Sequence, residues 1–427
     1  MSNVLVASPV EIDDIRRTRW AITLAASLGW FFDAYVITIY ALTIPFIAKE
    51  LQVSTLVLSG EVGSIFLVGY TIGTIGFGTV GDVLGRKTML GISIIGYGII
   101  TALTGFATSL LALALLRFLT GVAGGGELSI GAPYVSEVWD RKSRSTGIGI
   151  MYSFYPLGFV FAVLAFSVIT PILGWRAVYF FALVPAALIL FLRLRLEESP
   201  RFQNVVAQIE SGHKQRVGLL KALGNPVFRY RILVGSLIFM SLTYGYFAMV
   251  FYIPSFVIHQ YNLSPTVGAA AVTSLLQVSG IVGGLSGGFI GDRLGRRWPA
   301  MILAALGIVT IYLWWGLHWS LPGFCMMVFI GGFIVAYEWA VGIVYVSEIF
   351  PTEVRASGFG WSAGLGRTVS IAAPIMTQFL AGKFGVGVAI QLSSAIWLCL
   401  IIGYAISHET HGSELADRVE QMRHKQC

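Results

Sequence analysis

The chain alternates between long apolar stretches and short polar connections from one end to the other. A stretch of about 18 or more apolar residues is long enough to cross a hydrocarbon core of about 30 Å as a helix. Twelve such stretches occur in the 427 residues, six in each half. They are centred near Ala34, Phe66, Ile99, Ala123, Phe159, Leu188, Met249, Gly280, Thr310, Gly332, Ser370 and Ile396. The pattern predicts an all-α integral membrane protein with twelve transmembrane helices.

Two polar motifs recur along the chain at almost the same distance. YVSEVWDRKSRSTGIG begins at Tyr134 and YVSEIFPTEVRASGFG begins at Tyr345, an offset of 345 − 134 = 211 residues. GTVGDVLGRK begins at Gly78 and GFIGDRLGRR at Gly288, an offset of 288 − 78 = 210 residues. Because two unrelated motifs share one offset, the sequence predicts a duplicated unit, so the fold class is two six-helix bundles related by pseudo-symmetry.

Composition and charge placement agree with a membrane protein and give it an orientation. Hydrophobic residues make up 56% of the chain and charged residues 11%, and the formal net charge is +7. Of the 28 Lys and Arg, 23 fall before the first span, in even-numbered connections or after the last span. This asymmetry predicts that both termini are cytoplasmic, in a multi-pass protein of the cell membrane. The positive charge is therefore a signal of topology, and we expect no nucleic-acid partner.

These patterns divide the chain into five parts. We expect a cytoplasmic N-terminus at 1–19, bundles at 20–195 and 231–407, a cytoplasmic linker at 196–230 and a cytoplasmic C-terminus at 408–427. The N-terminus lacks a cleavable signal pattern. The chain has three cysteines and no CxxC pair, so we expect neither a disulfide framework nor a metal site. The spacing from Gly81 to Gly85 is one residue short of a P-loop, so we expect no cofactor.

Asp33 lies in the middle of the first span, where an ionisable group is costly. Trp30, Ile37 and Tyr40 share its face at helical spacing. Counting residues from the membrane edges places Asp33 roughly 10 Å from the outer edge and Arg117 of span four roughly 12 Å from it. We therefore expect Asp33 and Arg117 to pair. A structural ion pair and a protonatable site on a transport path both explain the pattern.

Arg367 lies about 15 Å deep in span eleven, which carries no acidic residue. Its partner is either a substrate carboxylate or a carboxylate on another helix. Further candidates for substrate contact are Trp30, Tyr35, Tyr244, Gln277 and Glu338. Glu338 repeats Glu127 in span four at the same offset of 211, so a shared structural role at the cytoplasmic end is an alternative for it.

The repeated motifs carry paired charges at the predicted cytoplasmic ends of the helices. We predict that these charges latch an inner gate when the outer side is open, by pairing or by capping helix ends. The glycines of the Gly78 motif are expected to let the chain reverse between two helices. The predicted gate residues are Asp82, Arg86, Glu137, Arg144, Asp292, Arg296, Glu348 and Arg355.

From about residue 20 to 412 the chain resembles the major facilitator superfamily. The doubled Gly-x-x-x-Asp-x-x-Gly-Arg-Lys/Arg motif is the most specific mark of the resemblance. RFLTGVAGGGE, PYVSEV, LEESPRF and ETHGSEL are similar to the branch of sugar porters, metabolite:proton symporters, and niacin and organic-anion carriers. The resemblance implies two bundles that rock about a central site. At matched positions it implies proton coupling by Asp33 and Arg117 and anion binding by Arg367.

We therefore predict a proton-coupled symporter of a small organic solute, with a carboxylate favoured, and no enzyme activity. The predicted spans contain no combination of a nucleophile with a general base, and no HExxH motif for a catalytic metal. The lipid bilayer, a small-molecule substrate and protons are the expected partners, and a monomer is the default. An organic-cation or multidrug transporter and a sugar transporter of the same superfamily remain open. The span-seven segment SLTYGYFAMVFYIP lacks the glutamine-rich signature of sugar carriers.

Overall fold

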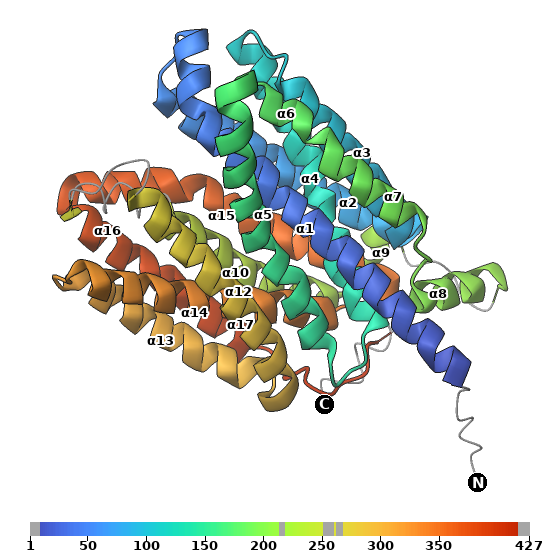
Figure 1. Cartoon of the computed structure of the whole chain (residues 1–427). Coiled ribbons are helices and arrows are strands. Elements are labelled where there is room, and N and C mark those ends of the chain that lie inside the picture. Colours follow the sequence, from blue (N-terminus) through green and yellow to red (C-terminus); the bar gives the residue numbers. More distant parts are fainter. Residues whose placement is uncertain (1–8, 213–217, 251–259, 262–267, 417–427) are drawn as a thin grey trace.

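The computed structural model describes residues 9–212, 218–250, 260–261 and 268–416 (Figure 1). Within these residues, 11 helices are long and apolar enough to cross a membrane. The N-terminal half contains α1 (Pro9–Leu51), α2 (Gly63–Leu84), α3 (Arg86–Thr104), α4 (Leu110–Val138), α5 (Arg144–Leu173), and the consecutive α6 (Ala177–Phe181) and α7 (Leu183–Leu194). A π-helical segment, Val57–Val62, leads into α2.

The C-terminal half repeats this series. It contains α10 (Pro226–Val250), α12 (Gly268–Leu294), α13 (Arg297–Gly316), α14 (Leu321–Glu348), α15 (Arg355–Phe384), α16 (Val386–Ser393) and α17 (Trp397–Ala405). The 30 residues of α15 correspond to the span predicted near Ser370, and at about 1.5 Å per residue they are long enough to cross a bilayer. The predicted all-α membrane fold is confirmed.

Helix starts repeat between the halves as the motifs do. Ser109 precedes α4, and its hydroxyl accepts the N–H of Ala112 at 3.2 Å. Ser320 precedes α14 and accepts the N–H of Gly323 at 3.4 Å. A serine at this position satisfies a backbone donor that the helix itself leaves unpaired. The two caps are 320 − 109 = 211 residues apart, so the duplication extends to local signals that start the helices.

Two short helices lie in the predicted linker. They are α8 (Pro200–Glu210) and α9 (Leu219–Leu223). The hydroxyl of Ser199 accepts the N–H of Phe202 at 3.3 Å, and Pro200 occupies the first turn of α8, where it needs no donor. The next helix, α10, starts at Pro226, four residues before the predicted end of the linker, and the predicted centre at Met249 falls at its end.

The halves form two bundles that contact through two matching helix pairs, α2 with α15 and α5 with α12. In Figure 1 the blue-to-green helices of the first bundle and the yellow-to-red helices of the second come together toward the side that carries α8. The chain segments near both ends meet the same connection on that side. Arg19 of α1 pairs with Asp140 at 3.4 Å, and Arg141 pairs with Glu414 at 3.7 Å.

The glycines of the repeated motifs lie where helices of the two halves cross. A methyl group on Gly360 of α15 would lie 2.5 Å from the carbonyl oxygen of Thr74 in α2, and one on Gly288 of α12 would lie 2.7 Å from that of Ser145 in α5. The prediction that Gly78 and Gly81 reverse the chain is wrong, because α2 continues through both. Only Gly85 turns the chain there, with a φ of 94°.

Candidate functional site

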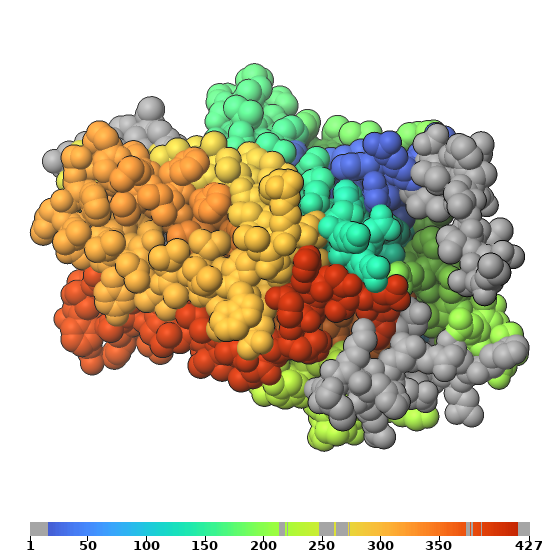
Figure 2. Space-filling model, turned by 90° about the horizontal axis from the view of Figure 1, so that it is seen from below, coloured from blue at the N-terminus to red at the C-terminus, as the bar shows by residue number. Residues whose placement is uncertain are grey.

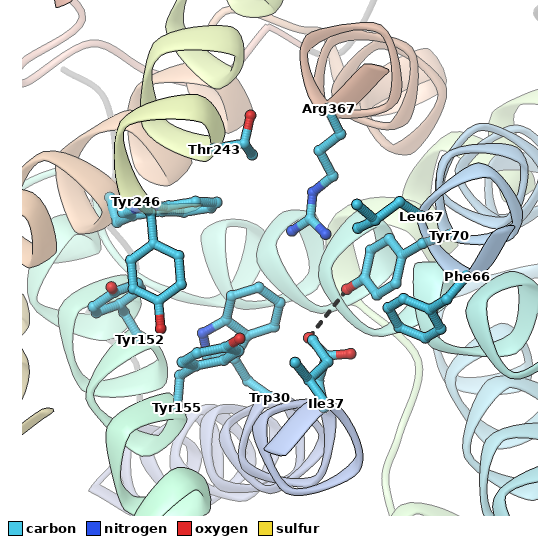
Figure 3. Close-up of a pocket in the computed structure, with 12 residues that line it drawn as sticks. Trp30, Ile37, Phe66, Leu67, Tyr70, Tyr152, Tyr155, Thr243, Tyr246 and Arg367 are labelled. Atoms are coloured by element: carbon cyan, nitrogen blue, oxygen red, sulfur yellow. Dashed lines mark hydrogen bonds between the residues drawn. The ribbon is translucent and has the colours of Figure 1, made fainter. Parts of the chain in front are cut away.

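A cavity lies between the two bundles (Figure 3). Helices α1, α2 and α5 line it from one half, and α10, α14 and α15 from the other. Seven of its twelve lining residues are aromatic. The lining residues are Trp30, Asp33, Ile37, Phe66, Leu67, Tyr70, Tyr152, Tyr155, Thr243, Tyr246, Trp339 and Arg367. An apolar cavity with two opposite charges is the usual form of a small-molecule site.

Asp33 reaches this cavity from α1, where the helical spacing predicted its face. Trp30, Asp33 and Ile37 all line the cavity, so the predicted shared face is confirmed for these three residues. Asp33 is 1% exposed. The hydroxyl of Tyr97 in α3 donates to its Oδ1 at 2.7 Å, and the hydroxyl of Tyr70 in α2 donates to its Oδ2 at 3.2 Å, a bond drawn dashed in Figure 3. Two phenols therefore hold the carboxyl group in place.

Arg117 does not form the predicted pair with Asp33 in this conformation. Among the described residues the two have no N–O distance within 4.0 Å. The guanidinium of Arg117 lies between two rings instead, 4.1 Å from the ring centroid of Tyr40 and 4.2 Å from that of Phe66. Counting residues gave the depth of each group but not its direction around the helix axis, and Tyr70 and Tyr97 occupy the carboxylate oxygens.

Arg367 extends from α15 into the cavity toward Tyr70, as Figure 3 shows. Its Cζ lies 4.3 Å from the ring centroid of Tyr70 and 6.0 Å from that of Trp339. Within the described part of the chain it forms no ion pair, although its charge acts on Asp33 across the cavity. A buried cation against aromatic faces and without a bonded carboxylate is suited to receive an anion.

The other predicted contact residues fall in different places. Trp30 lines the cavity, whereas Tyr35 lies in the core of the first bundle, where its hydroxyl donates to the carbonyl oxygen of Val178 at 2.7 Å. Tyr244 is buried beside Val369 and Ile396, outside the cavity. Gln277 lines a second, adjacent cavity. In this conformation Tyr35 and Tyr244, predicted as candidates for substrate contact, therefore do not line the cavity.

Glu338 does not line the cavity either, although its neighbour Trp339 does. It is fully buried, and neither carboxyl oxygen has a hydrogen-bond partner among the described residues. Its repeat mate Glu127 accepts a hydrogen bond from Arg193 at 2.9 Å. The residue 211 positions after Arg193 is Tyr404, so the second half lacks the matching cation. Glu127 has a structural ion pair, and that role is not shared by Glu338.

The eight predicted gate residues form a buried charge network of two groups of four, and each group joins the two bundles. Glu137 pairs with Arg86 of its own half at 3.1 Å and with Arg355 of the other half at 3.0 Å. Glu348 pairs with Arg296 of its own half at 3.0 Å and with Arg144 of the other half at 2.7 Å. Each glutamate therefore holds one arginine from each half.

The two aspartates of the network cap helices of the opposite half. Asp82 of α2 accepts the N–H of Ser357 at 2.7 Å and that of Ala356 at 3.2 Å, at the start of α15. Asp292 of α12 accepts the N–H of Ser145 at 2.9 Å and that of Thr146 at 2.7 Å, at the start of α5. A carboxylate at a helix N-terminus satisfies unpaired donors and the positive end of the helix dipole. Asp82 and Asp292 also pair with Arg86 and Arg296, at 2.9 and 3.3 Å.

A further pair of carboxylates supports this network, and the sequence analysis did not single it out. Glu409 accepts the N–H groups of Arg296 and Arg297 at 3.0 Å each, at the start of α13. Glu198 accepts the N–H of Lys87 at 3.1 Å, at the start of α3. Burial raises the pKa of Glu409, but its backbone N–H donors outweigh this effect and hold the pKa below its ordinary value. The offset 409 − 198 = 211 was the signal that could have found the pair.

The segment that ends at Ala416 crosses the network on the outside. The hydroxyl of Thr410 donates to Glu348 at 2.5 Å, and the N–H of Thr352 donates to the carbonyl oxygen of Ala416 at 2.8 Å. Figure 2 shows this segment, in red, between the yellow helices of one half and the teal connection of the other. The two halves are therefore closed against each other on the side of the chain termini.

Several lining aromatics were not predicted as site residues. Tyr70, Tyr152, Tyr155 and Tyr246 come from three different helices, and nothing in their sequence surroundings separates them from packing tyrosines. In the described ranges, no group of three or more His, Cys, Asp or Glu residues could hold a metal ion. The chemistry available in the cavity is therefore that of one carboxyl group, one guanidinium and aromatic faces.

Comparisons with known proteins agree with this geometry. The model of the Major Facilitator Superfamily matches residues 26–315. The benzoate transport protein of Acinetobacter baylyi is 27% identical over 86% of this chain and 85% of its own length. The sialic acid transporter NanX of Escherichia coli is 26% identical over 90% of this chain and 93% of its own length. The solved structure of the proton:xylose symporter XylE matches with a TM-score of 0.81 at 18% identity, over 95% of this chain and 99% of that one.

Proposed function

The chain belongs to the major facilitator superfamily and is a multi-pass membrane transporter rather than an enzyme, and we propose that it imports a small organic carboxylate together with a proton. The observation that carries the proposal is the position of Arg367. Its guanidinium enters an aromatic cavity between the bundles and has no ion-pair partner among the described residues. A carboxylate substrate supplies that partner, and its apolar part packs on the aromatic walls.

The relatives support a carboxylate as the substrate class. Benzoate and sialic acid, which their printed names give as the cargo of two relatives, are both carboxylates. A sugar or an organic cation has no group that would neutralise Arg367. A buried guanidinium that loses its water without gaining an anion is costly, so the cavity favours anionic solutes over both alternatives.

Asp33 is the group that we assign to the proton. It faces the same cavity as Arg367, and a proton on its carboxyl group removes a negative charge that would otherwise repel an incoming carboxylate. Arg117 is the second member of the proposed coupling pair. It is held between Tyr40 and Phe66 here, while the charge of Asp33 still acts on it, so it is the cation available when Asp33 ionises. In this proposal the proton binds before the substrate, so the carboxylate enters a cavity from which the negative charge of Asp33 has been removed.

The charge network that joins the bundles is the proposed inner gate. In this conformation it is closed, and the central cavity lies beyond it. The basic residues concentrate on the same side, which we assign to the cytoplasm by the positive-inside rule. Rocking of the two bundles would break the links between halves and open the cavity to the cytoplasm. One polypeptide holds both bundles, and we propose a monomer as the working unit.

The experiment that tests this function is uptake by the purified protein in proteoliposomes. Benzoate, sialic acid, xylose and an organic cation such as tetraethylammonium are offered with and without an inward proton gradient. We expect accumulation of a carboxylate only when the outside is acidic and its collapse when a protonophore is added. Uptake that follows the carboxylate gradient but ignores the proton gradient would identify a uniporter, and uptake of only the sugar or the cation would refute the anion assignment.

A further inference from the structure

The described helices contain three buried carboxyl groups outside the charge network of the proposed gate, and each has different surroundings. Asp33 lines the central cavity. Glu127 has a fixed counter-ion, because Arg193 donates to it at 2.9 Å. Glu338 of α14 has neither, since it does not line the cavity and forms no ion pair within the described ranges. The number of protons that the carrier holds therefore depends on the state of Glu338 as well as on Asp33.

Glu338 faces the interior of the second bundle. Gly342 lies one helical turn after it, on the same face of α14. A methyl group on Gly342 would lie 2.8 Å from Cδ1 of Leu242 in α10 and 3.6 Å from the hydroxyl of Tyr404 in α17. Helices α10, α14 and α17 all belong to the second bundle. The carboxyl group is therefore enclosed by one bundle, whereas the next residue, Trp339, lines the cavity between the two.

No cation neutralises Glu338 in the part of the chain that the structure describes. Its charge acts on two phenols, Tyr337 of α14 and Tyr404 of α17, whose hydroxyls also lack a bonded partner there. Helices α4, α5, α10, α12, α13 and α15 pack against α14. Their charged residues, which include Arg231 and Arg367, exert no effect on Glu338. Because an ionised carboxylate without a counter-ion is very costly in an apolar interior, the group holds a proton instead.

We propose that Glu338 keeps its proton throughout the transport cycle, so that Asp33 carries the single transported proton and symport of a monovalent carboxylate is electroneutral. Rocking moves each bundle as a body, so the three helices around Glu338 move together and keep water away from it. Each cycle then carries one positive and one negative charge inward, and the net charge moved is zero. The inference rests on the proposed function, because it takes Asp33 as the coupling site and a carboxylate as the cargo.

The test separates the two components of the proton gradient in proteoliposomes that contain the full-length protein. Benzoate and sialic acid are the probes, and protein-free liposomes correct for passive entry. A pH difference alone should accumulate a probe about tenfold per pH unit, because one proton accompanies each anion. A potassium diffusion potential set by valinomycin, negative inside and at equal pH, should accumulate nothing. If a second proton were carried, about 100 mV of potential would raise accumulation about 50-fold.

Accumulation driven by the potential alone would overturn the inference while the proposed function stands. Uptake of neither probe under either gradient would overturn the proposed function, and the inference with it. These two measurements need only the wild type, so they decide the matter even where a variant at position 338 does not fold.

Glu338→Gln tests the resident proton directly, because the amide resembles a protonated carboxyl group. The variant should keep the wild-type accumulation under a pH difference. The unfolded wild-type chain releases the proton that the folded chain holds, so the stability of the wild type should fall as the pH rises. The melting temperature of Glu338→Gln relative to wild type should therefore increase from about pH 6 to about pH 8.

Glu127→Gln is the matched control from the other half of the duplication. It leaves Arg193 without its carboxylate, so it should lower the melting temperature by an amount that does not change over the same pH range. A difference between Glu338→Gln and wild type that is equally independent of pH would show that Glu338 is ionised, and would overturn the inference. Loss of pH-driven accumulation in a folded Glu338→Gln protein would overturn it too, because the proton at Glu338 would then be one that is transported.

Discussion

The ring of Tyr70 in α2 lies under the guanidinium of Arg367 in α15, with 4.3 Å between Cζ and the ring centroid. The hydroxyl of the same tyrosine donates to Asp33 of α1 at 3.2 Å. One side chain of the first bundle therefore contacts both the proposed anion-binding residue of the second bundle and the proposed proton carrier. A change of charge at Asp33 can alter the position of Tyr70 and, through it, the environment of Arg367.

Replacing Asp33 with Asn should abolish proton-driven accumulation. The amide cannot bind and release a proton, yet it keeps the size of the side chain and resembles the protonated, uncharged carboxyl group. We expect exchange of labelled for unlabelled substrate to continue, measured as counterflow in proteoliposomes without a gradient. Asp140→Asn is the control, because its side chain is 80% exposed. Accumulation by Asp33→Asn at the wild-type level would rule out this residue as the coupling site.

Replacing Arg367 with Met should weaken binding of a carboxylate substrate. Loss of a charge-assisted hydrogen bond of about 1.5–3 kcal/mol raises the apparent dissociation constant about 10- to 100-fold. The measurement is calorimetric binding of the substrate found by uptake. Arg293→Met is the control, since Arg293 is exposed and lies over the ring of Phe289 at 3.9 Å. Equal affinity of Arg367→Met and wild type would place the anion site elsewhere.

Replacing Arg144 with Met should favour conformations that are open on the side of the termini. The change removes the 2.7 Å link between Arg144 and Glu348, whereas Glu348 keeps Arg296 at 3.0 Å. A loss of about 1–3 kcal/mol in the closed state would raise the open population at least several-fold. A cysteine introduced by Ser357→Cys, in a chain without other cysteines, should then react faster with a polar thiol reagent. An unchanged rate would contradict the gate assignment.

Replacing Gly360 with Val should force α2 and α15 apart. The Cβ atom of any side chain at position 360 would lie 2.5 Å from the backbone carbonyl oxygen of Thr74. A backbone atom cannot move aside as the end of a flexible side chain can. We expect the closed state to lose about 1–3 kcal/mol and transport to fall sharply. Gly76→Val in α2 is the matched control, because nothing lies within 4 Å of its added carbon. Normal transport by Gly360→Val would contradict this, because it would mean that the crossing of α2 and α15 has more room than the structure shows.

Replacing Glu409 with Ala should lower thermal stability at neutral pH. Its lowered pKa means that folding favours the ionised form, so its stabilising contribution is present above the ordinary pKa of a glutamate and is lost as the pH falls through the lowered value. We expect a loss of about 1 kcal/mol, as for other helix caps, constant between pH 6 and 8. The difference from wild type in thermal unfolding should shrink below about pH 4. A difference that grows in acid would contradict the sign of the shift.

The charged contacts of the proposed gate could be predicted from the sequence because the duplication marked their residues. Asp82 and Arg86 recur at an offset of 210 residues and Glu137 and Arg144 at an offset of 211, and charges at helix ends have few partners other than each other. What the repeats could not give was the cross-pairing, in which Arg144 binds the glutamate of the other half. That choice depends on how the bundles pack, which no single motif contains.

The central site was less accessible to sequence reasoning. Asp33 and Arg367 were recognisable because a charge in an apolar span is costly, and this cost does not depend on its neighbours. Tyr70 and Tyr97 carry no such signal, since a tyrosine side chain is found both in packed cores and in the walls of cavities. The expected partnership of Asp33 with Arg117 failed for the same reason, because the two phenols that occupy the carboxylate could not be seen in advance.

The double pairing of Glu137 and Glu348 has a consequence for the proposed inner gate. When the bundles separate, each glutamate gives up one arginine and keeps the other, so neither carboxylate becomes a lone charge inside the protein. In the proposed opening, Arg144 and Arg355 lose their carboxylate partners, and Asp82 and Asp292 lose the helix N-termini that they cap in the opposite half. In the proposed gate, sharing each glutamate between two arginines thus lowers the free energy needed to separate the bundles.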